Sequence, residues 1–156
     1  MTRRRRFERA TLLGHGPDVL DRAGRALLGW EMHRGAGLVV DRSGSPGPAA
    51  PGRRVVLRPR TGPAAWLRMS APCEVTEVVD TADARGFTYR TLPGHPERGT
   101  ETFLVERDPA TDEVWARIRA ESEPGRLLVR LAGPVARAEQ DRITGRYLSV
   151  LGRLAG

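Results

Sequence analysis

The sequence predicts an α+β fold, in which a curved antiparallel β-sheet wraps around a long C-terminal helix. Three observations support this prediction. Four β-type runs with short connectors follow one another over residues 74–122, an amphipathic helical pattern precedes them at residues 17–33, and a longer one closes the chain. The length of 156 residues fits one domain with its own core, and we expect this domain to span residues 7–156.

The N-terminal end carries a run of like charges from Arg3 to Arg6, and we expect residues 1–6 to be disordered. With Phe7, this run resembles the start of an export signal, but charged residues follow it instead of the apolar stretch that such a signal needs. No window approaches the ~18 apolar residues of a membrane span. A cytoplasmic location is therefore expected, and an opening strand is predicted over residues 7–13.

A helix is predicted over residues 17–33. Pro17 suits its first position, where no backbone N–H is needed. Apolar residues recur at helical spacing from Val19 to Trp30, and Gly35 ends the pattern. Short strands are then expected at residues 37–41, 54–58 and 66–69, the last as an edge strand, with a Pro- and Gly-rich loop at residues 43–52.

The strand pattern becomes dense after Cys73. Turn residues in the connectors and a spacing of about 8–13 residues favour an antiparallel meander. Helical spacing returns afterwards, and a helix is predicted over residues 126–155, either kinked at Gly133-Pro134 or divided there into two pieces. The four predicted strands cover residues 74–80, 86–92, 100–107 and 113–122.

The order of elements is therefore strand, helix, about six strands and a long helix. This order fits the helix-grip fold of START and Bet v 1-like domains. A sheet with one apolar face needs a cover, and the C-terminal helix is the long amphipathic element that can supply it. Sheets of this kind usually leave a cavity between sheet and helix, which is the expected ligand site.

The net charge of +7 invites a nucleic-acid interpretation. Every basic residue is arginine, however, and the high content of Ala, Gly and Pro indicates the codon bias of a high-GC genome. Most arginines alternate with acidic residues, as on a solvated surface, and no aromatic platforms are interleaved with them. Nucleic-acid binding is therefore disfavoured.

The single cysteine, Cys73, excludes an intrachain disulfide framework and an all-cysteine zinc site. The three histidines are scattered along the sequence, so no metal site is expected. Phosphate-binding and dinucleotide-binding motifs are also missing from the sequence, and no cofactor is expected.

The stretch TLPGHPERG, Thr91–Gly99, connects two predicted strands and contains His95 and Glu97. In a functional interpretation His95 is a general acid or base that Glu97 orients, because residues i and i+2 of an extended segment can face the same side. The other interpretation is a wide polar turn, since Pro and Gly surround the histidine. A catalytic His95 requires its ring at the mouth of a cavity, with Glu97 within hydrogen-bonding distance.

Several stretches together are similar to a known family. They are GWEMHRGAGL (Gly29–Leu38), GFTYRTLPGHPERGTETFLVE (Gly86–Glu106), VWARIRAESEP (Val114–Pro124), and LAGPVARAEQ with RYL (Leu131–Leu148). The chain from Gly14 onward resembles domain-of-unknown-function family 1990, also catalogued as uncharacterised protein family 0548. TLPGHPE with the following E-x-F is the most specific part. The resemblance implies a stand-alone soluble domain found in bacteria and plants, with no assigned biochemistry.

Residues that would face the expected cavity are the candidates for ligand binding. Trp30 and His33 end the first helix and would line one end of the cavity; a core tryptophan and a surface histidine are the alternative. Trp115, Arg117 and Arg119 share one strand face, which is usually solvated but would bind an acidic group if it pointed inward. The candidate ligand-binding residues are Trp30, His33, Trp66, Phe87, Tyr89, Trp115, Arg117, Arg119 and Tyr147.

Two functions remain compatible with the sequence, because a fold of this kind supports both. The first is the binding of a hydrophobic or amphipathic small molecule in the sheet–helix cavity. The alternative is a metal-independent biosynthetic enzyme, such as a cyclase, isomerase or hydrolase, in which His95 and Glu97 transfer protons. The sequence does not fix the oligomeric state.

Overall fold

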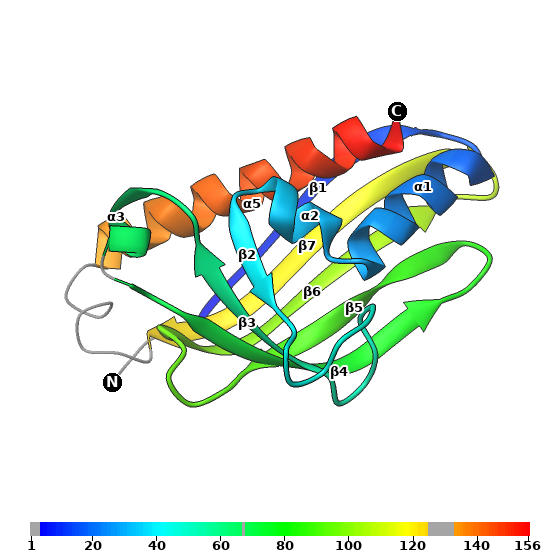
Figure 1. Cartoon of the computed structure of the whole chain (residues 1–156). Helices are drawn as coiled ribbons and strands as arrows, with labels where there is room; N and C mark the ends of the chain where they lie inside the picture. Colours follow the sequence, from blue (N-terminus) through cyan, green and yellow to red (C-terminus); the bar gives the residue numbers. More distant parts are fainter. Residues whose placement is uncertain (1–3, 67, 125–132) are drawn as a thin grey trace.

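The structure, a computed structural model, describes residues 4–66, 68–124 and 133–156. Within these residues seven strands form one antiparallel sheet in the order β1-β7-β6-β5-β4-β3-β2, and helices cover one face of it (Figure 1). The strands are β1 (Arg5–His15), β2 (Leu38–Asp41), β3 (Arg54–Pro59), β4 (Ala71–Asp80), β5 (Ala84–Thr91), β6 (Glu97–Arg107) and β7 (Glu113–Pro124), and the helices are α1 (Pro17–Leu28), α2 (Glu31–Gly35), α3 (Gly62–Trp66) and α5 (Gly133–Ala155).

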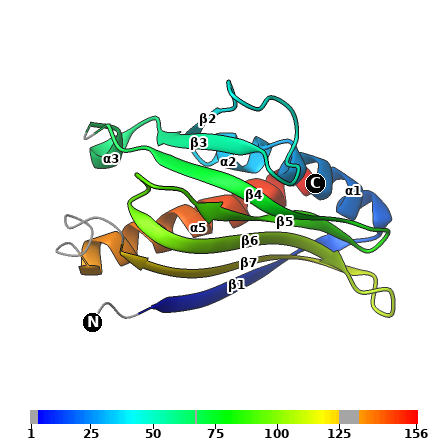
Figure 2. The same cartoon turned by 90° about the horizontal axis from the view of Figure 1, so that it is seen from below.

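The strands from β2 to β7 form a meander, because each pairs with the next along the chain. Strand β1 lies at the far edge beside β7, so α1 and α2 carry the chain across from one edge of the sheet to the other. Figure 2 shows the strands in front and the helices behind them. The predicted curved sheet with a C-terminal helix is confirmed.

The predicted helix over residues 17–33 is two helices. α1 ends at Leu28, and Trp30 adopts a left-handed conformation with φ of 67° before α2 begins. The Trp30 side chain is fully buried, with its ring centroid 4.9 Å from that of Phe87. Burial of so large a ring offsets the backbone strain of a left-handed non-glycine residue.

The predicted edge strand over residues 66–69 is wrong. The short helix α3 covers Gly62–Trp66, and backbone hydrogen bonds continue the turn from Arg68 to Ala65 and from Met69 to Ala64. Alanine is a strong helix former, and Ala64 and Ala65 lie at the centre of this segment. β3, the strand just before it, is already paired on both sides, with β2 and β4.

The expected disorder of residues 1–6 is wrong for residues 4–6, and residues 1–3 lie outside the described residues. Strand β1 begins at Arg5 and pairs with the end of β7, where Arg5 lies opposite Ser122. Arg4 and Arg6 both form ion pairs with Glu121, at 2.7 and 3.1 Å. Residues 4–6 are thus ordered by a distant strand that sequence order alone does not bring near them.

The C-terminal helix α5 begins at Gly133, and the predicted part over residues 126–132 lies outside the described residues. Its backbone runs close to α1, α2 and β1 and stays farther from the central strands. Its first turns are largely exposed, whereas Thr144, Tyr147 and Leu151 are buried. In the described part of the chain, no helix is long and apolar enough to cross a membrane.

Candidate functional site

The inner face of the sheet has an aromatic half and a half with small side chains. In the aromatic half, Phe87 of β5 lies opposite Phe103 of β6, and the rings of Trp30, His33 and Tyr147 pack around them. The other half surrounds Glu101. Its inward positions are Gly99 and Thr91, Ala120 and Ser122 on β7, and Cys73 on β4.

Glu101 stands at the boundary between the two halves. Strand alternation turns it inward together with Phe103 and Val105, because successive side chains of a strand point to opposite faces. Its Oε2 accepts a hydrogen bond of 3.5 Å from the hydroxyl of Tyr89, which lies opposite it on β5. The residue is deep among protein atoms, yet part of its surface stays accessible.

Burial raises the pKa of Glu101 to about 8, and the neighbouring carboxyl of Glu97 adds to this shift while the Tyr89 hydroxyl opposes it. Loss of water disfavours the charged form of a carboxyl group. Glu101 is therefore mostly a neutral carboxylic acid at pH 7. A carboxyl in this state can donate a proton, or take one up again after ionisation, close to neutral pH.

His33 extends the polar contacts of Glu101 into the ring cluster. Its Nε2 lies 3.4 Å from the hydroxyl oxygen of Tyr89. In the arrangement in which that hydroxyl donates to Glu101, the neutral histidine donates at Nε2 and Nδ1 is an acceptor. Nδ1 is fully buried and has no hydrogen-bond partner among the described residues. Burial lowers the pKa of His33 to about 3, with a smaller contribution from Arg34, so the ring is neutral.

Glu97 connects the sheet to α5. Its Oε2 accepts a hydrogen bond of 3.4 Å from Nε2 of Gln140, whose Oε1 accepts one of 3.2 Å from Arg5. Burial raises the pKa of Glu97, whereas Ser122 and Arg5 lower it. The amide of Gln140 thus links β1, α5 and β6 at the end of the sheet where the small side chains lie.

The inner face of α5 continues from Gln140 to Thr144 and Tyr147, which lie about one turn apart. Thr144 is fully buried, and its Oγ1 has no hydrogen-bond partner in the described part of the chain. The pKa of the Tyr147 hydroxyl is raised by burial and by the nearby Glu101 carboxyl. These three side chains therefore face the region around Glu101 from the helix side.

His95 lies in the connector before β6, as predicted, and its ring turns back to its own backbone. Nδ1 accepts a hydrogen bond of 2.9 Å from the backbone N–H of Glu97. Within the described residues, no hydrogen bond joins the ring to the Glu97 carboxylate. Burial lowers the pKa of His95 to about 4. The expected meeting of His95 and Glu97 is thus a local contact that shapes the turn.

Of the nine predicted ligand-binding residues, five lie in the buried interior and four do not. Trp66 on α3 is 82% exposed. Trp115, Arg117 and Arg119 occupy the face of β7 opposite the buried Val114, Ala116 and Ile118, because the polar side of a half-buried strand faces solvent. The five interior residues are Trp30, His33, Phe87, Tyr89 and Tyr147.

The arginines on the outer face are already paired. Arg117 contacts Glu106 at 3.0 Å, and Arg119 contacts Glu8 at 3.2 Å. The Trp115 indole N–H donates to Glu113 at 3.1 Å. The sequence-based alternative, in which these arginines bind an acidic ligand inside the cavity, is therefore wrong.

The residues of the candidate site that sequence reasoning missed are Glu101, Gln140 and Thr144. Glu101 is the glutamate of the E-x-F signal, and its inward orientation follows from alternation with the buried Phe103. Gln140 and Thr144 lie at i and i+4 on the same helix face as Tyr147. Helical spacing could have found them if polar residues had been included in the apolar stripe.

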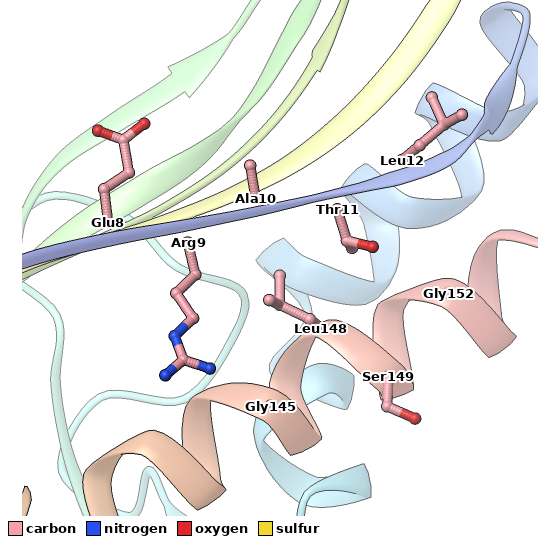
Figure 3. Close-up of a pocket in the computed structure, with 9 residues that line it drawn as sticks. All are labelled: Glu8, Arg9, Ala10, Thr11, Leu12, Gly145, Leu148, Ser149 and Gly152. Atoms are coloured by element: carbon pink, nitrogen blue, oxygen red, sulfur yellow. The ribbon is translucent and has the colours of Figure 1, made fainter.

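A separate hollow of about 650 Å³ lies at the seam between β1 and α5 (Figure 3). Arg9 and Thr11 point from β1 toward the helix, and Leu148 points back toward the strand. Gly145 and Gly152 carry no side chain, so the surface of α5 is recessed at these two positions. Arg9 is paired with Asp141 at 3.3 Å, and none of the lining side chains is a buried acid or base. The seam is therefore a hollow that could accept a molecule by its shape, but its lining contains no buried acid or base that could act on it.

No group of three or more His, Cys, Asp or Glu side chains that could hold a metal ion occurs in the described ranges.

Comparisons with known structures place the fold. Norcoclaurine synthase from Thalictrum flavum, in complex with dopamine and hydroxybenzaldehyde, matches with a TM-score of 0.61 at 13% identity, over 98% of this chain and 87% of its own. A hypothetical protein of Helicobacter pylori gives 0.64 at 14% identity, over 99% and 88%. The ginseng major latex-like protein 151 of Panax ginseng gives 0.56 at 16%, over 94% and 96%. At these identities the likeness concerns the fold alone, a helix-grip.

Sequence comparisons identify the family. A protein of Deinococcus radiodurans described as a UPF0548 protein is 36% identical over 149 residues, which cover 92% of this chain and 75% of the relative. The model of a domain of unknown function, DUF1990, matches residues 3–150. Both findings confirm the resemblance carried by TLPGHPE and the neighbouring stretches, and the chain belongs to the DUF1990 family.

Proposed function

We propose that this protein binds a hydrophobic or amphipathic small molecule between the inner face of the sheet and α5, beside Glu101. The observation that carries the proposal is the state of Glu101, a carboxyl that is deep in the protein and still partly accessible. Buried ionisable groups with perturbed pKa values occur most often at functional sites. Pockets for small molecules are mainly apolar with a few polar groups that fix orientation.

The side chains around Glu101 support a site of this kind. Ala120 lies opposite Glu101 on β7, and Gly99 and Ser122 form the next inward pair along the strands. Small side chains at these positions fill little of the space between the sheet and α5, and a ligand there would take the place of larger side chains. The aromatic rings of Phe103 and Tyr147, 5.6 Å apart, provide an apolar wall next to it.

The fold relatives are consistent with this function. The norcoclaurine synthase structure contains dopamine and hydroxybenzaldehyde, two small aromatic molecules. A shared fold does not transfer a ligand from one protein to another. It supports only the general expectation that a helix-grip can hold an aromatic molecule under its long helix.

A filling mutation tests the proposed site. In Ala120→Leu a larger side chain enters the space beside Glu101, whereas in the matched control Ala116→Leu it enters the packed aromatic half, where Ala116 lies opposite Val105. The neutral fluorophore N-phenylnaphthylamine serves as the ligand probe. We expect the unmodified protein to bind the probe, Ala120→Leu to remain stable but lose binding, and Ala116→Leu to lose about 1–3 kcal/mol of stability through overpacking.

The result that would overturn the proposal is equally clear. If Ala120→Leu destabilises the protein as much as Ala116→Leu, and if the unmodified protein does not bind the probe, the region around Glu101 is packed core. Native mass spectrometry of the protein purified under gentle conditions adds a second readout, since a copurified molecule should be present in the unmodified protein and absent from Ala120→Leu.

A second candidate function is proton transfer on the bound molecule, as in an isomerase, cyclase or hydrolase. The observation that favours it is the pKa of about 8 at Glu101, next to the hydroxyl of Tyr89. A general acid or base works best with a pKa near the working pH. The enzyme hypothesis drawn from the sequence assigned proton transfer to His95 and Glu97. The geometry supports Glu101 for this role better than His95. Chemical change of the copurified molecule by the unmodified protein, but not by Glu101→Gln, would establish it.

A further inference from the structure

We infer that the molecule bound beside Glu101 is an organic cation, namely a protonated amine carried on an apolar or aromatic body. This inference rests on the proposed function and specifies its ligand class. It is carried by the charges and unpaired polar atoms that the fold brings together under α5, and by the rings next to them.

Two carboxyl groups face the same interior. Glu97 and Glu101 are four residues apart on β6, so alternation directs both side chains inward. In the described part of the chain, Glu101 takes part in no ion pair. Arg5 acts on Glu97, but its guanidinium already contacts Gln140 and Asp141, at 3.2 and 3.1 Å. The pair of carboxyls therefore has room for one further positive charge.

Thr144 provides a second and independent observation. It is fully buried on α5, and its Oγ1 has no partner among the residues that the structure describes. It lies one turn after Gln140, which binds Glu97, and one turn before Tyr147, which packs on Phe103. A buried hydroxyl without a partner is costly, and an ammonium N–H group of a ligand would satisfy its oxygen.

The rings beside the carboxyls suit the same ligand. Tyr89 and Tyr147 both pack on Phe103, with ring centroids 5.2 and 5.6 Å apart in edge-to-face geometry. Aromatic faces attract cations, most strongly where water is excluded. A ligand with an ammonium group and an apolar body would place its charge near Glu97 and Glu101 and its body toward these rings.

An anionic ligand fits the site poorly. Two inward carboxyls disfavour a negative charge beside them. On the inner side, Arg5 and Arg9 are both already paired with Asp141. Arg117 and Arg119 lie on the outer face of the sheet and pair with other carboxylates there. A neutral ligand would leave Glu101 without a positive partner. A buried carboxylate becomes favourable when an opposite charge and hydrogen bonds accompany it, and an amine supplies both.

Matched probes test the charge preference at one pH near neutrality. Benzylamine, benzyl alcohol and benzoate share a body and differ in charge, and naphthylmethylamine, naphthalenemethanol and naphthoate form a larger set. Binding is measured by isothermal titration calorimetry and by displacement of N-phenylnaphthylamine. We expect the amine of at least one set to bind about tenfold or more tightly than its alcohol, and the carboxylate to bind most weakly.

Two variants assign the preference to the named groups. Glu101→Gln keeps the shape of the side chain and should reduce the ratio of amine to alcohol affinity to about one, while alcohol and fluorophore binding persist. Thr144→Val should weaken amine binding about three- to tenfold with little effect on the alcohol. Glu139→Gln serves as the control, because Glu139 pairs with Arg142 on the exposed side of α5, and it should leave every affinity unchanged.

Each outcome separates this inference from the proposed function. If the fluorophore and the alcohols bind but the amines bind no more tightly, the interior site stands and the cationic ligand class is wrong. Preferential binding of the carboxylates would overturn the inference in the same way. If no probe and no fluorophore binds, the proposed site itself falls, and the inference falls with it.

Discussion

The hydroxyl of Tyr89 donates a hydrogen bond to Oε2 of Glu101 across the pair of strands β5 and β6, at 3.5 Å. The same hydroxyl oxygen lies 3.4 Å from Nε2 of His33. A change in the protonation of Glu101 therefore reaches the aromatic core through one side chain. It follows that the stability of the protein, as well as ligand binding, should depend on the charge of this carboxyl.

The first prediction concerns the pH dependence of stability. The pKa of Glu101 is raised from 4.5 to about 8, so between these values the folded protein holds a proton that the unfolded chain has released. Stability must then fall as pH rises through this window, by at most about 1.4 kcal/mol per pH unit from this group. Glu101→Gln cannot ionise. We expect it to be more stable than the unmodified protein at about pH 8. This difference in stability should shrink as the pH is lowered toward about 5.

Urea unfolding at a series of pH values measures this difference, with Glu139→Gln as the control for the loss of one exposed carboxylate. Because Glu139 has a lowered pKa and pairs with Arg142, its replacement should not produce a gain of stability at higher pH. Identical pH profiles for Glu101→Gln and the unmodified protein would show that Glu101 is ionised and well solvated in the folded state.

The second prediction concerns His95, whose Nδ1 accepts the backbone N–H of Glu97. The oxygen of an asparagine side chain can take the same position, so His95→Asn should retain stability near pH 7, whereas His95→Ala should lose about 1 kcal/mol. Ligand binding should survive in His95→Asn. If a folded His95→Asn protein bound the ligand but no longer converted it, the acid–base role that the sequence suggested would be restored.

His95 also contributes to acid sensitivity. Its pKa is lowered from 6.5 to about 4, so below about pH 6.5 the unfolded chain binds a proton that the folded protein does not. Stability from this group is therefore lost as pH falls through this window. His95→Asn should lose less stability than the unmodified protein between about pH 6.5 and about pH 4, as urea unfolding at both values will measure.

The meander and the covering helix could be predicted from the sequence because their signals are local. Strand alternation and turn residues mark β4 to β7, and helical spacing marks most of α5. The errors have non-local causes. Trp30 breaks the first helix because its ring is buried against Phe87 on a distant strand, and Arg5 belongs to β1 because β7 pairs with it. Neither contact leaves a pattern in the neighbouring sequence.

The apolar part of the candidate site could be predicted from the sequence, but its central carboxyl could not. Apolar and aromatic residues such as Phe87 and Tyr89 follow from alternation and the need for a core. Glu101 was not found, because a glutamate in a strand is normally assigned to the solvated face. Its inward position depends on register with Tyr89 and Ala120. The outer position of Arg117 followed the usual rule for a half-buried strand, and the inward alternative failed.

The third prediction concerns Thr144, whose buried hydroxyl has no partner among the described residues. Valine has nearly the same shape and no polar atom. Thr144→Val should therefore be neutral or should stabilise the ligand-free protein by up to about 1–2 kcal/mol, as measured by urea unfolding. A loss of more than about 1 kcal/mol would mean that the hydroxyl is already satisfied in the folded protein, and it would remove Thr144 from the ligand site.

The fourth prediction tests the close approach of strands that shapes the site. Gly99 has φ of 154°, and a Cβ atom at this position would lie 1.9 Å from the backbone oxygen of Glu121. A backbone atom cannot move aside as a flexible side chain can, so Gly99→Ala must displace β6 from β7 next to Glu101. We expect a loss of about 3 kcal/mol or more, or failure to fold.

Gly44 provides the matched comparison, because a Cβ atom there would meet nothing within 4 Å. Gly44→Ala lies in the loop after β2 and should change stability by less than about 0.5 kcal/mol. Thermal and urea unfolding of both variants measure the difference. A Gly99→Ala protein with unchanged stability would mean that β6 and β7 are farther apart at this point than the pairing of Gly99 with Ser122 requires. The close pair of Gly99 and Ser122 beside Glu101, from which the proposed site is built, would then be wrong.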